Sequence, residues 1–311
     1  MLRIWLGIAA VLAAHSVAWG EEGGYGHYVP GISGTLVDRP STEPGWAGHV
    51  DGLYFDGGSK GPVQVLGPFT PNDMEADLGA VTLGAAYTFD ERIANAFFSV
   101  GLVVPFIDLE VSANVATPLG NVPVTHTDSG IGDIAIIPAM LAWQRGNMQF
   151  GVSVPVYLPT GGYEVGRLAN VGKNYLTVDP TVSLSYTNPA TGFSASGFMG
   201  LTLNTKNTAT QYQSGSLFHL EASAQQLFPV GPGYLGIGAE AFYLQQISDD
   251  SGPGALLGGF RGRSIGIGPV LTYVLPLDNV TGAIEAKWLP EIDTENRIAG
   301  DYFWVKGVLQ F

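Results

Sequence analysis

The sequence has no cysteine, little charge and, after residue 20, no apolar run as long as a membrane helix. Without cysteine the protein has no disulfides, thiol nucleophiles or thiolate metal ligands. Charged residues make up 13% of the 311 residues, against about 25% in soluble proteins. A membrane-spanning helix needs about 20 consecutive apolar residues. A closed β-barrel needs only alternate apolar residues and satisfies its backbone groups within one sheet. It therefore fits both the low charge content and the lack of a membrane-spanning helix.

The charge that is present is mostly negative, with a formal net charge of −14. Nucleic acids are bound by basic stripes, so we expect no nucleic-acid partner. The spacing of His, Asp and Glu indicates no transition-metal site, and we expect no cofactor. Acidic residues in the predicted outer loops offer oxygen ligands for Ca²⁺ or Mg²⁺, or are simply solvated. They are Asp249, Asp250, Glu291, Asp293 and Glu295.

Residues 1–20 have the features of a secretory signal peptide. A short basic start at Arg3 precedes an apolar stretch over residues 4–14, and Ala18 and Gly20 supply small residues for cleavage. An N-terminal membrane anchor is the alternative, but the apolar stretch is short and no stop-transfer pattern follows. We therefore expect export.

Segments with alternating apolar and polar residues recur through the mature sequence, as in the run from Met148 to Leu158. Strand side chains alternate between two faces, so each segment predicts a strand with one apolar face. Each spans about ten residues, which fits a tilted membrane-spanning strand. We place twelve strands near residues 46–57, 76–90, 95–106, 131–143, 147–158, 175–187, 192–204, 215–228, 232–247, 260–275, 280–291 and 301–311.

The predicted connections alternate between short and long, as the periplasmic turns and outer loops of bacterial barrels do. Twelve is an even number, as such single-chain barrels require. Residues 107–117, which we place in a long loop over residues 107–130, also fit a strand, so fourteen strands is the alternative. The prediction is an all-β, transmembrane, antiparallel up-and-down barrel over residues 46–311.

The last strand resembles the closing strand of a bacterial outer-membrane barrel. Phe303, Val305, Leu309 and the terminal Phe311 share one side, whereas Lys306 lies on the other. In such barrels the terminal aromatic residue is recognised during assembly. We therefore expect an integral protein of the bacterial outer membrane. Its expected partners are lipid, lipopolysaccharide and, through this strand, the barrel assembly machinery.

Residues 21–45 lack the alternation of a strand. They are rich in Gly and aromatic residues, among them Tyr25 and Tyr28, and Pro40 and Pro44 follow. We expect this segment to lie in or near the lumen as a constriction or plug. The alternative is a disordered periplasmic tail, since chain ends are often loose.

Stretches spread over most of the mature chain resemble one family, the Phenol MetA degradation-pathway (SphA-like) family of outer-membrane transporters. The resemblance implies a β-barrel linked to the uptake of aromatic or other hydrophobic compounds, and it supplies no catalytic residues. The stretches are residues 22–31, 130–134, 159–163, 174–180, 204–215, 245–252, 266–269 and 295–301.

Charged residues on the polar strand faces should point inward, because a Lys or Arg at the lipid midplane costs about 2–4 kcal/mol. They either form a polar network that holds a plug or lines a pathway, or neutralise one another across a narrow barrel. About eight strands leave a lumen filled by side chains, and 16–18 leave an aqueous channel, so twelve strands fit a plugged or narrowly open lumen. The residues are Asp133, Asp179, Glu221, Glu240, Glu285, Lys287 and Lys306.

Aromatic side chains in the lumen would stack on a flat, apolar cargo. The alternative for aromatic residues is a girdle at the membrane interfaces, which Trp143, Tyr157, Tyr186, Tyr273 and Trp288 fit better. The residues that we expect along a substrate pathway are Tyr25, His27, Tyr28, Tyr54, His219, Glu221, Glu240, Phe242 and Trp304.

His219, Glu221 and Ser223 share one face of a predicted strand, which raises the possibility of a lipid hydrolase. Successive same-face residues lie roughly 6–7 Å apart, beyond a Ser–His hydrogen bond of ~3 Å. We therefore interpret them as a polar lumen row and expect no enzyme activity. The function that we expect is a channel for passive uptake of small hydrophobic, chiefly aromatic, compounds. A structural or adhesive barrel with a sealed lumen is the alternative.

Overall fold

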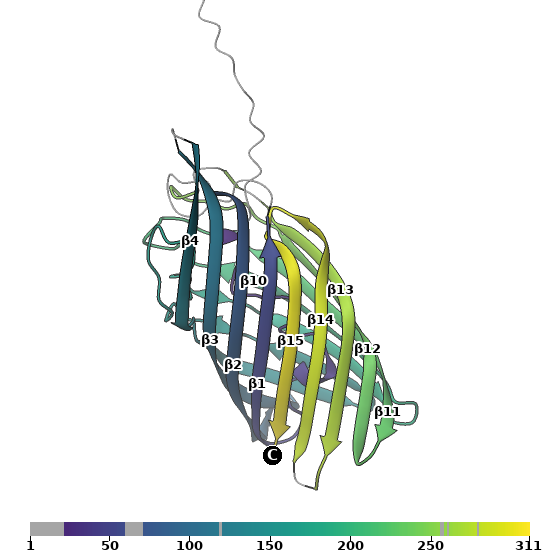
Figure 1. Cartoon of the computed structure of the whole chain (residues 1–311). Coiled ribbons are helices and arrows are strands. Elements are labelled where there is room, and N and C mark those ends of the chain that lie inside the picture. The colour runs from purple at the N-terminus through teal and green to yellow at the C-terminus, as the bar shows by residue number, and fades with distance from the viewer. Residues whose placement is uncertain (1–21, 60–70, 118–119, 256–257, 260, 279) are drawn as a thin grey trace, which may run out of the picture.

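The computed structural model of the protein describes residues 22–59, 71–117, 120–255, 258–259, 261–278 and 280–311. The predicted signal peptide lies outside this range, as do residues 60–70 of the first predicted long loop. The described residues form one antiparallel sheet of fifteen strand segments. Strand β1 (Gly45–Gly58) pairs with β15 (Ala299–Gln310), from Ala47 opposite Gln310 to Gly58 opposite Ala299. This pairing closes the sheet into a slanted barrel (Figure 1).

Three barrel strands are each interrupted once. In each, two segments follow one another along the same barrel strand. The pairs of segments are β4 and β5, β6 and β7, and β8 and β9; β4 and β5, for example, pair with successive parts of β3. Counted this way, the described residues form twelve barrel strands, as predicted, and the fourteen-strand alternative is wrong. The segments between β1 and β15 are β2 (Pro71–Ile93), β3 (Ala96–Thr117), β4 (Gly120–Ile131), β5 (Ala135–Arg145), β6 (Met148–Ser153), β7 (Val156–Tyr157), β8 (Thr177–Val178), β9 (Thr181–Asn188), β10 (Phe193–Asn204), β11 (Leu217–Val230), β12 (Gly233–Gln246), β13 (Arg263–Pro276) and β14 (Thr281–Glu295).

The predicted long loop over residues 107–130 is wrong. β3 runs on to Thr117 and β4 returns along it, with Phe106 opposite Ile131 and Thr117 opposite Gly120. The two arms extend above the other strands in Figure 1. Most side chains of β4 are exposed, so burial imposes no apolar alternation there. Backbone pairing between the two arms therefore defines this hairpin, and a hydrophobic pattern does not reveal it.

The alternation of side chains sorts each strand into an outer and an inner face. In β15, Phe303 and Val305 are 41% and 58% exposed, whereas Trp304 and Lys306 are 5% and 2% exposed. The outer face is apolar and suits lipid, and the polar and charged side chains point into the barrel. This confirms the predicted facing of the last strand. Recognition of that strand by the assembly machinery stays a prediction.

The turns between β5 and β6, β9 and β10, and β11 and β12 are short. The antiparallel pairing places all three at the end of the barrel that holds the C-terminus, and Figure 1 shows the ends of β11 and β12 there. Short turns mark the periplasmic side of outer-membrane barrels. We call this the short-turn end. Among the residues that the structure describes, no helix is both long and apolar enough to cross a membrane.

Candidate functional site

The N-terminal segment, residues 22–44, lies inside the barrel and contacts its inward-facing side chains. Tyr28 is almost fully buried, and its hydroxyl donates a hydrogen bond to the buried carboxylate of Glu221. The Trp304 indole Nε1 donates to the carbonyl oxygen of Pro30 over 2.8 Å. Residues more than 190 positions apart are thus joined in the lumen.

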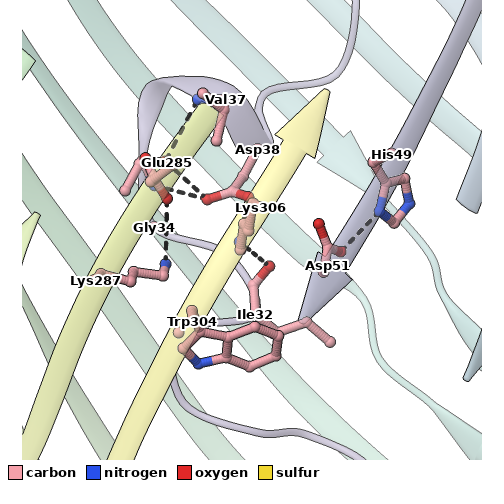
Figure 2. A network of polar contacts seen from close by, with 12 residues as sticks. Ile32, Gly34, Val37, Asp38, His49, Asp51, Glu285, Lys287, Trp304 and Lys306 are labelled. Carbon is pink, nitrogen blue, oxygen red and sulfur yellow. Dashed lines mark hydrogen bonds and ion pairs between the residues drawn. The ribbon is translucent and has the colours of Figure 1, made fainter. Parts of the chain in front are cut away.

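Lys306 fixes a second part of this segment. Its Nζ donates to the carbonyl oxygen of Ile32 over 2.9 Å and to Asp38 Oδ1 over 2.6 Å. Figure 2 shows Ile32 and Asp38 beside Lys306 of β15. Burial acts to raise the pKa of the Asp38 carboxyl, but Lys306 and Lys287 outweigh it and hold that pKa below its usual range. Asp38 is therefore ionised and anchors the segment electrostatically.

Lys287 of β14 lies at the centre of a buried ionic cluster. Its Nζ is 3.0 Å from both carboxylate oxygens of Glu240 and 3.7 Å from Glu285 Oε1, and all three side chains are fully buried. The Thr272 hydroxyl donates to Glu285 Oε2 over 2.9 Å. A buried charge survives only when it is paired and hydrogen-bonded. The lumen charges therefore pair with one another and also bind the N-terminal segment.

Two glycines let this segment approach the charged wall closely. Gly34 has φ +134°, and a Cβ there would lie 2.7 Å from Cδ and 2.8 Å from Oε1 of Glu240. Gly31 has φ +86°, and a Cβ there would meet the indole of Trp304. A side chain at either position would need both a strained backbone and displacement of a buried neighbour.

Aromatic rings cover the apolar part of the lumen. The ring of Tyr28 stacks on His219 with centroids 3.6 Å apart, and His219 Nε2 lies 2.8 Å from Asp179 Oδ1. The ring of Phe242 meets that of Tyr302 edge to face at 6.0 Å. Tyr28, Phe242 and Trp304 belong to one buried apolar cluster. Its other larger members are Leu53, Phe55, Met74, Leu109, Val111, Leu217, Leu244, Leu289, Ile298 and Tyr302.

The first aromatic residues of the segment lie against a different part of the wall. His27 Nε2 lies 2.8 Å from Asp133 Oδ2, and its ring stacks on that of Tyr157 at 4.9 Å. The Tyr25 hydroxyl donates to the carbonyl oxygen of Asn170 over 3.3 Å. Tyr157, which we assigned to the interfacial girdle, therefore lies inside the barrel, and that assignment is wrong. In the predicted strand over residues 147–158, Tyr157 falls on the same polar face as Gln149, which already indicates the inner face.

All the candidate pathway residues except Tyr54 lie in the lumen. Tyr54 is 49% exposed, its ring lies 6.3 Å from that of the outward-facing Phe303, and its hydroxyl donates to Asp77 Oδ1 over 3.2 Å. The expectation that Tyr54 faces the lumen is wrong, because its neighbours Leu53 and Phe55 occupy the inner face. These two were missed, although their alternation places them opposite Tyr54.

The polar row on β11 does not assemble as a hydrolase. The Ser223 hydroxyl donates to the carbonyl oxygen of Gly34 over 2.7 Å, and His219 pairs with Asp179. In the outer loops, Asp249 pairs with Arg261 at 2.7 Å. Among the described residues, no group of three or more His, Asp or Glu side chains is arranged to hold a metal ion.

Comparison with solved structures shows the same fold. An outer membrane channel from Pseudomonas putida F1 aligns with a TM-score of 0.63 and 14% identity, over 88% of this chain and 97% of that one. The β domain of the Bordetella autotransporter BrkA aligns with a TM-score of 0.47 and 10% identity, over 86% of this chain and 100% of that one. The second likeness is too weak to carry an argument. The first agrees with the closed barrel and its lipid-facing exterior, the architecture of an integral outer-membrane protein.

No curated protein sequence matches the chain. The model of the family described as "Putative MetA-pathway of phenol degradation" matches residues 59–307. This range covers most of the barrel strands and the majority of the stretches on which the resemblance was based. The resemblance inferred from the sequence is thereby confirmed, and the chain belongs to this family.

Proposed function

We propose that the protein is a channel for the passive uptake of small hydrophobic, chiefly aromatic, compounds across the outer membrane. The observation that carries this proposal is the buried apolar cluster in the lumen, in which the rings of Tyr28, Phe242, Tyr302 and Trp304 pack together. Aromatic rings give a flat, apolar ligand a large contact area in favourable stacked or edge-on geometry. Such a lining suits benzene-like compounds better than ions or sugars.

Two comparisons support the proposal. The family description refers to phenol degradation, and the Pseudomonas putida protein of the same fold is described as an outer membrane channel. We infer that cargo moves down its concentration gradient.

A strain that lacks the protein is expected to take up aromatic compounds more slowly at low external concentration. Wild-type protein should restore uptake. Phe242→Ala should lower it about threefold to tenfold, because one aromatic contact contributes about 0.5–1.5 kcal/mol. Trp288→Ala removes an aromatic ring from the outer face and serves as the control. The measurement is the initial uptake rate of labelled phenol, toluene and benzoate.

An unchanged uptake rate of all three compounds in the deletion strain would contradict the proposal. Equal loss with Phe242→Ala and Trp288→Ala would show that the effect does not come from the lumen.

We further propose that the N-terminal segment is a plug that narrows the channel. Gly34→Ala is expected to loosen it and to raise the conductance of the reconstituted protein, because the strained backbone alone costs about 1–3 kcal/mol and the new Cβ meets Glu240. The matched control is Gly166→Ala, since Gly166 also has positive φ (+92°) but nothing lies within 4 Å of its Cβ position. Planar-bilayer conductance measures both variants. The same conductance for both would argue against a plug held at Gly34.

The number of bonds between the segment and the wall also fits a second function, a structural barrel with a sealed lumen. Conductance and liposome swelling separate the two. A sealed barrel passes neither ions nor solutes in wild-type form or with Gly34→Ala.

A further inference from the structure

The lumen wall near the short-turn end is built from uncharged polar side chains, unlike the ionic cluster. On three neighbouring strands, β9, β10 and β11, Thr187 lies opposite Ser194 and Ser194 opposite Gln225. The next row, two residues farther from the short-turn end, consists of Ser185, Ser196 and Ser223. Apart from the half-buried Thr187, these side chains are buried. The two rows form a polar patch on the inner wall, at the exit to the periplasm in the orientation assigned above.

This patch has unused hydrogen-bonding capacity. The Oγ of Ser196 and both amide atoms of Gln225 are buried, and none has a hydrogen-bond partner among the described residues. A buried polar atom without a partner is costly, and such atoms in native proteins call for an explanation. A polar ligand or water at the patch would supply the missing partners.

Arg39 of the N-terminal segment lies against this patch. Its Nε donates to the carbonyl oxygen of Leu36 over 2.9 Å, and its Nη1 lies 3.3 Å from Thr187 Oγ1. Thr187 Oγ1 in turn lies 3.1 Å from Ser194 Oγ. The guanidinium therefore reaches the first polar row and is linked to its two hydroxyl groups.

Arg39 differs from the other lumen cations in its partners. Lys287 and Lys306 pair with carboxylates, whereas Arg39 makes no ion pair in the described part of the chain. A guanidinium has five N–H donors in a planar fork that matches a carboxylate. Arg39 uses two of them, both on neutral oxygens, and keeps donors for an anionic group.

We propose that Arg39, with the hydroxyls of Thr187 and Ser194, binds the carboxylate of an otherwise apolar cargo molecule at the periplasmic exit. This inference rests on the proposed function and narrows it, because it adds an acid group to the aromatic cargo. The apolar cluster contacts the ring of such a molecule earlier on its path, because Phe242 lies opposite Glu221, four residues before Gln225 on β11. The polar patch is where its charged end then finds a cation without an acidic partner.

Equilibrium dialysis of the nanodisc-embedded protein, with empty nanodiscs as background, tests the site. Labelled benzoate and the neutral benzyl alcohol are compared. Arg39→Gln should weaken benzoate binding about tenfold or more, because a charge-assisted hydrogen bond is lost, and should leave benzyl alcohol unaffected. Arg39→Lys, which keeps the charge but loses the planar fork, should weaken benzoate binding less than Arg39→Gln does. Thr187→Val, which removes only the hydroxyl, should weaken benzoate binding about fivefold and serves if Arg39→Gln fails to fold.

Each remaining outcome overturns the site. Unchanged benzoate binding in both Arg39→Gln and Thr187→Val would rule out the carboxylate site. It would not affect the proposal that the channel takes up neutral aromatic compounds. Displacement of benzoate by inorganic phosphate at equal concentration would show a general anion site instead of a cargo site. Weakened binding of benzyl alcohol to the same extent as benzoate would show that Arg39 acts only by positioning the segment. Failure of the proposed function is recognised separately, by unchanged uptake in the deletion strain.

Discussion

Leu184→Arg is expected to keep most of the protein from folding into the membrane. Leu184 lies in β9, opposite Phe150 on β6 and Gly197 on β10, and 45% of its side chain is exposed on the outer face. Its position within the barrel strand formed by β8 and β9 places it in the lipid-facing band. An arginine there loses hydration without gaining a partner, at about 2–4 kcal/mol near the midplane. That is a large fraction of the stability of a typical domain.

The folded fraction can be measured from the different electrophoretic mobility of folded and heat-unfolded barrel after refolding into lipid vesicles. The matched control is Leu277→Arg, the same substitution at an exposed leucine in the turn after β13. There the arginine reaches water, so folding should be unchanged. Equal folded fractions for the two variants would mean that Leu184 does not face lipid, and the assigned outer face would be wrong.

The barrel could be predicted from the sequence because each strand residue has one of two environments. In β15 the lipid side is apolar and the inner side carries Lys306, so the period of two identifies both the strand and its facing. In β1 the two faces do not differ in polarity in this way, so the same reasoning cannot assign them. Leu53 and Phe55 line an apolar part of the lumen while Tyr54 faces outward. Where the lumen itself is apolar, alternation shows that a strand exists but not which face is inside.

Contacts between the N-terminal segment and the wall could not be predicted from the sequence. Tyr28 bonds to Glu221 across 193 positions, and Arg39 to Thr187 across 148. A periodic pattern carries information about neighbours on one strand and none about which strand a separate segment touches. Composition showed that the segment is aromatic and not a strand. Its attachment depends on the curvature of the closed barrel, which brings β9, β11 and β15 around one space.

Lys287→Met is expected to lower the free energy of unfolding by about 3–5 kcal/mol, the usual loss when one partner of a buried ion pair is removed. The Nζ of the fully buried Lys287 contacts the carboxylates of both Glu240 and Glu285. Methionine fills a similar volume, so the loss comes from the carboxylates left without a positive partner in a dry environment. Chemical denaturation of the vesicle-embedded barrel measures the change.

The double variant Lys287→Met/Glu240→Met separates pairing from packing. Removing both charges should restore part of the stability, since replacing a whole buried pair by apolar groups is often close to neutral, and the difference from additivity gives the coupling. Lys206→Met, at an exposed loop lysine, should change stability by no more than about 0.5 kcal/mol. An equally small effect of Lys287→Met would mean that water reaches the cluster and screens it. Because Gly34 of the N-terminal segment lies against Glu240, a wet cluster would also imply a loosely held segment and a lumen that conducts without Gly34→Ala.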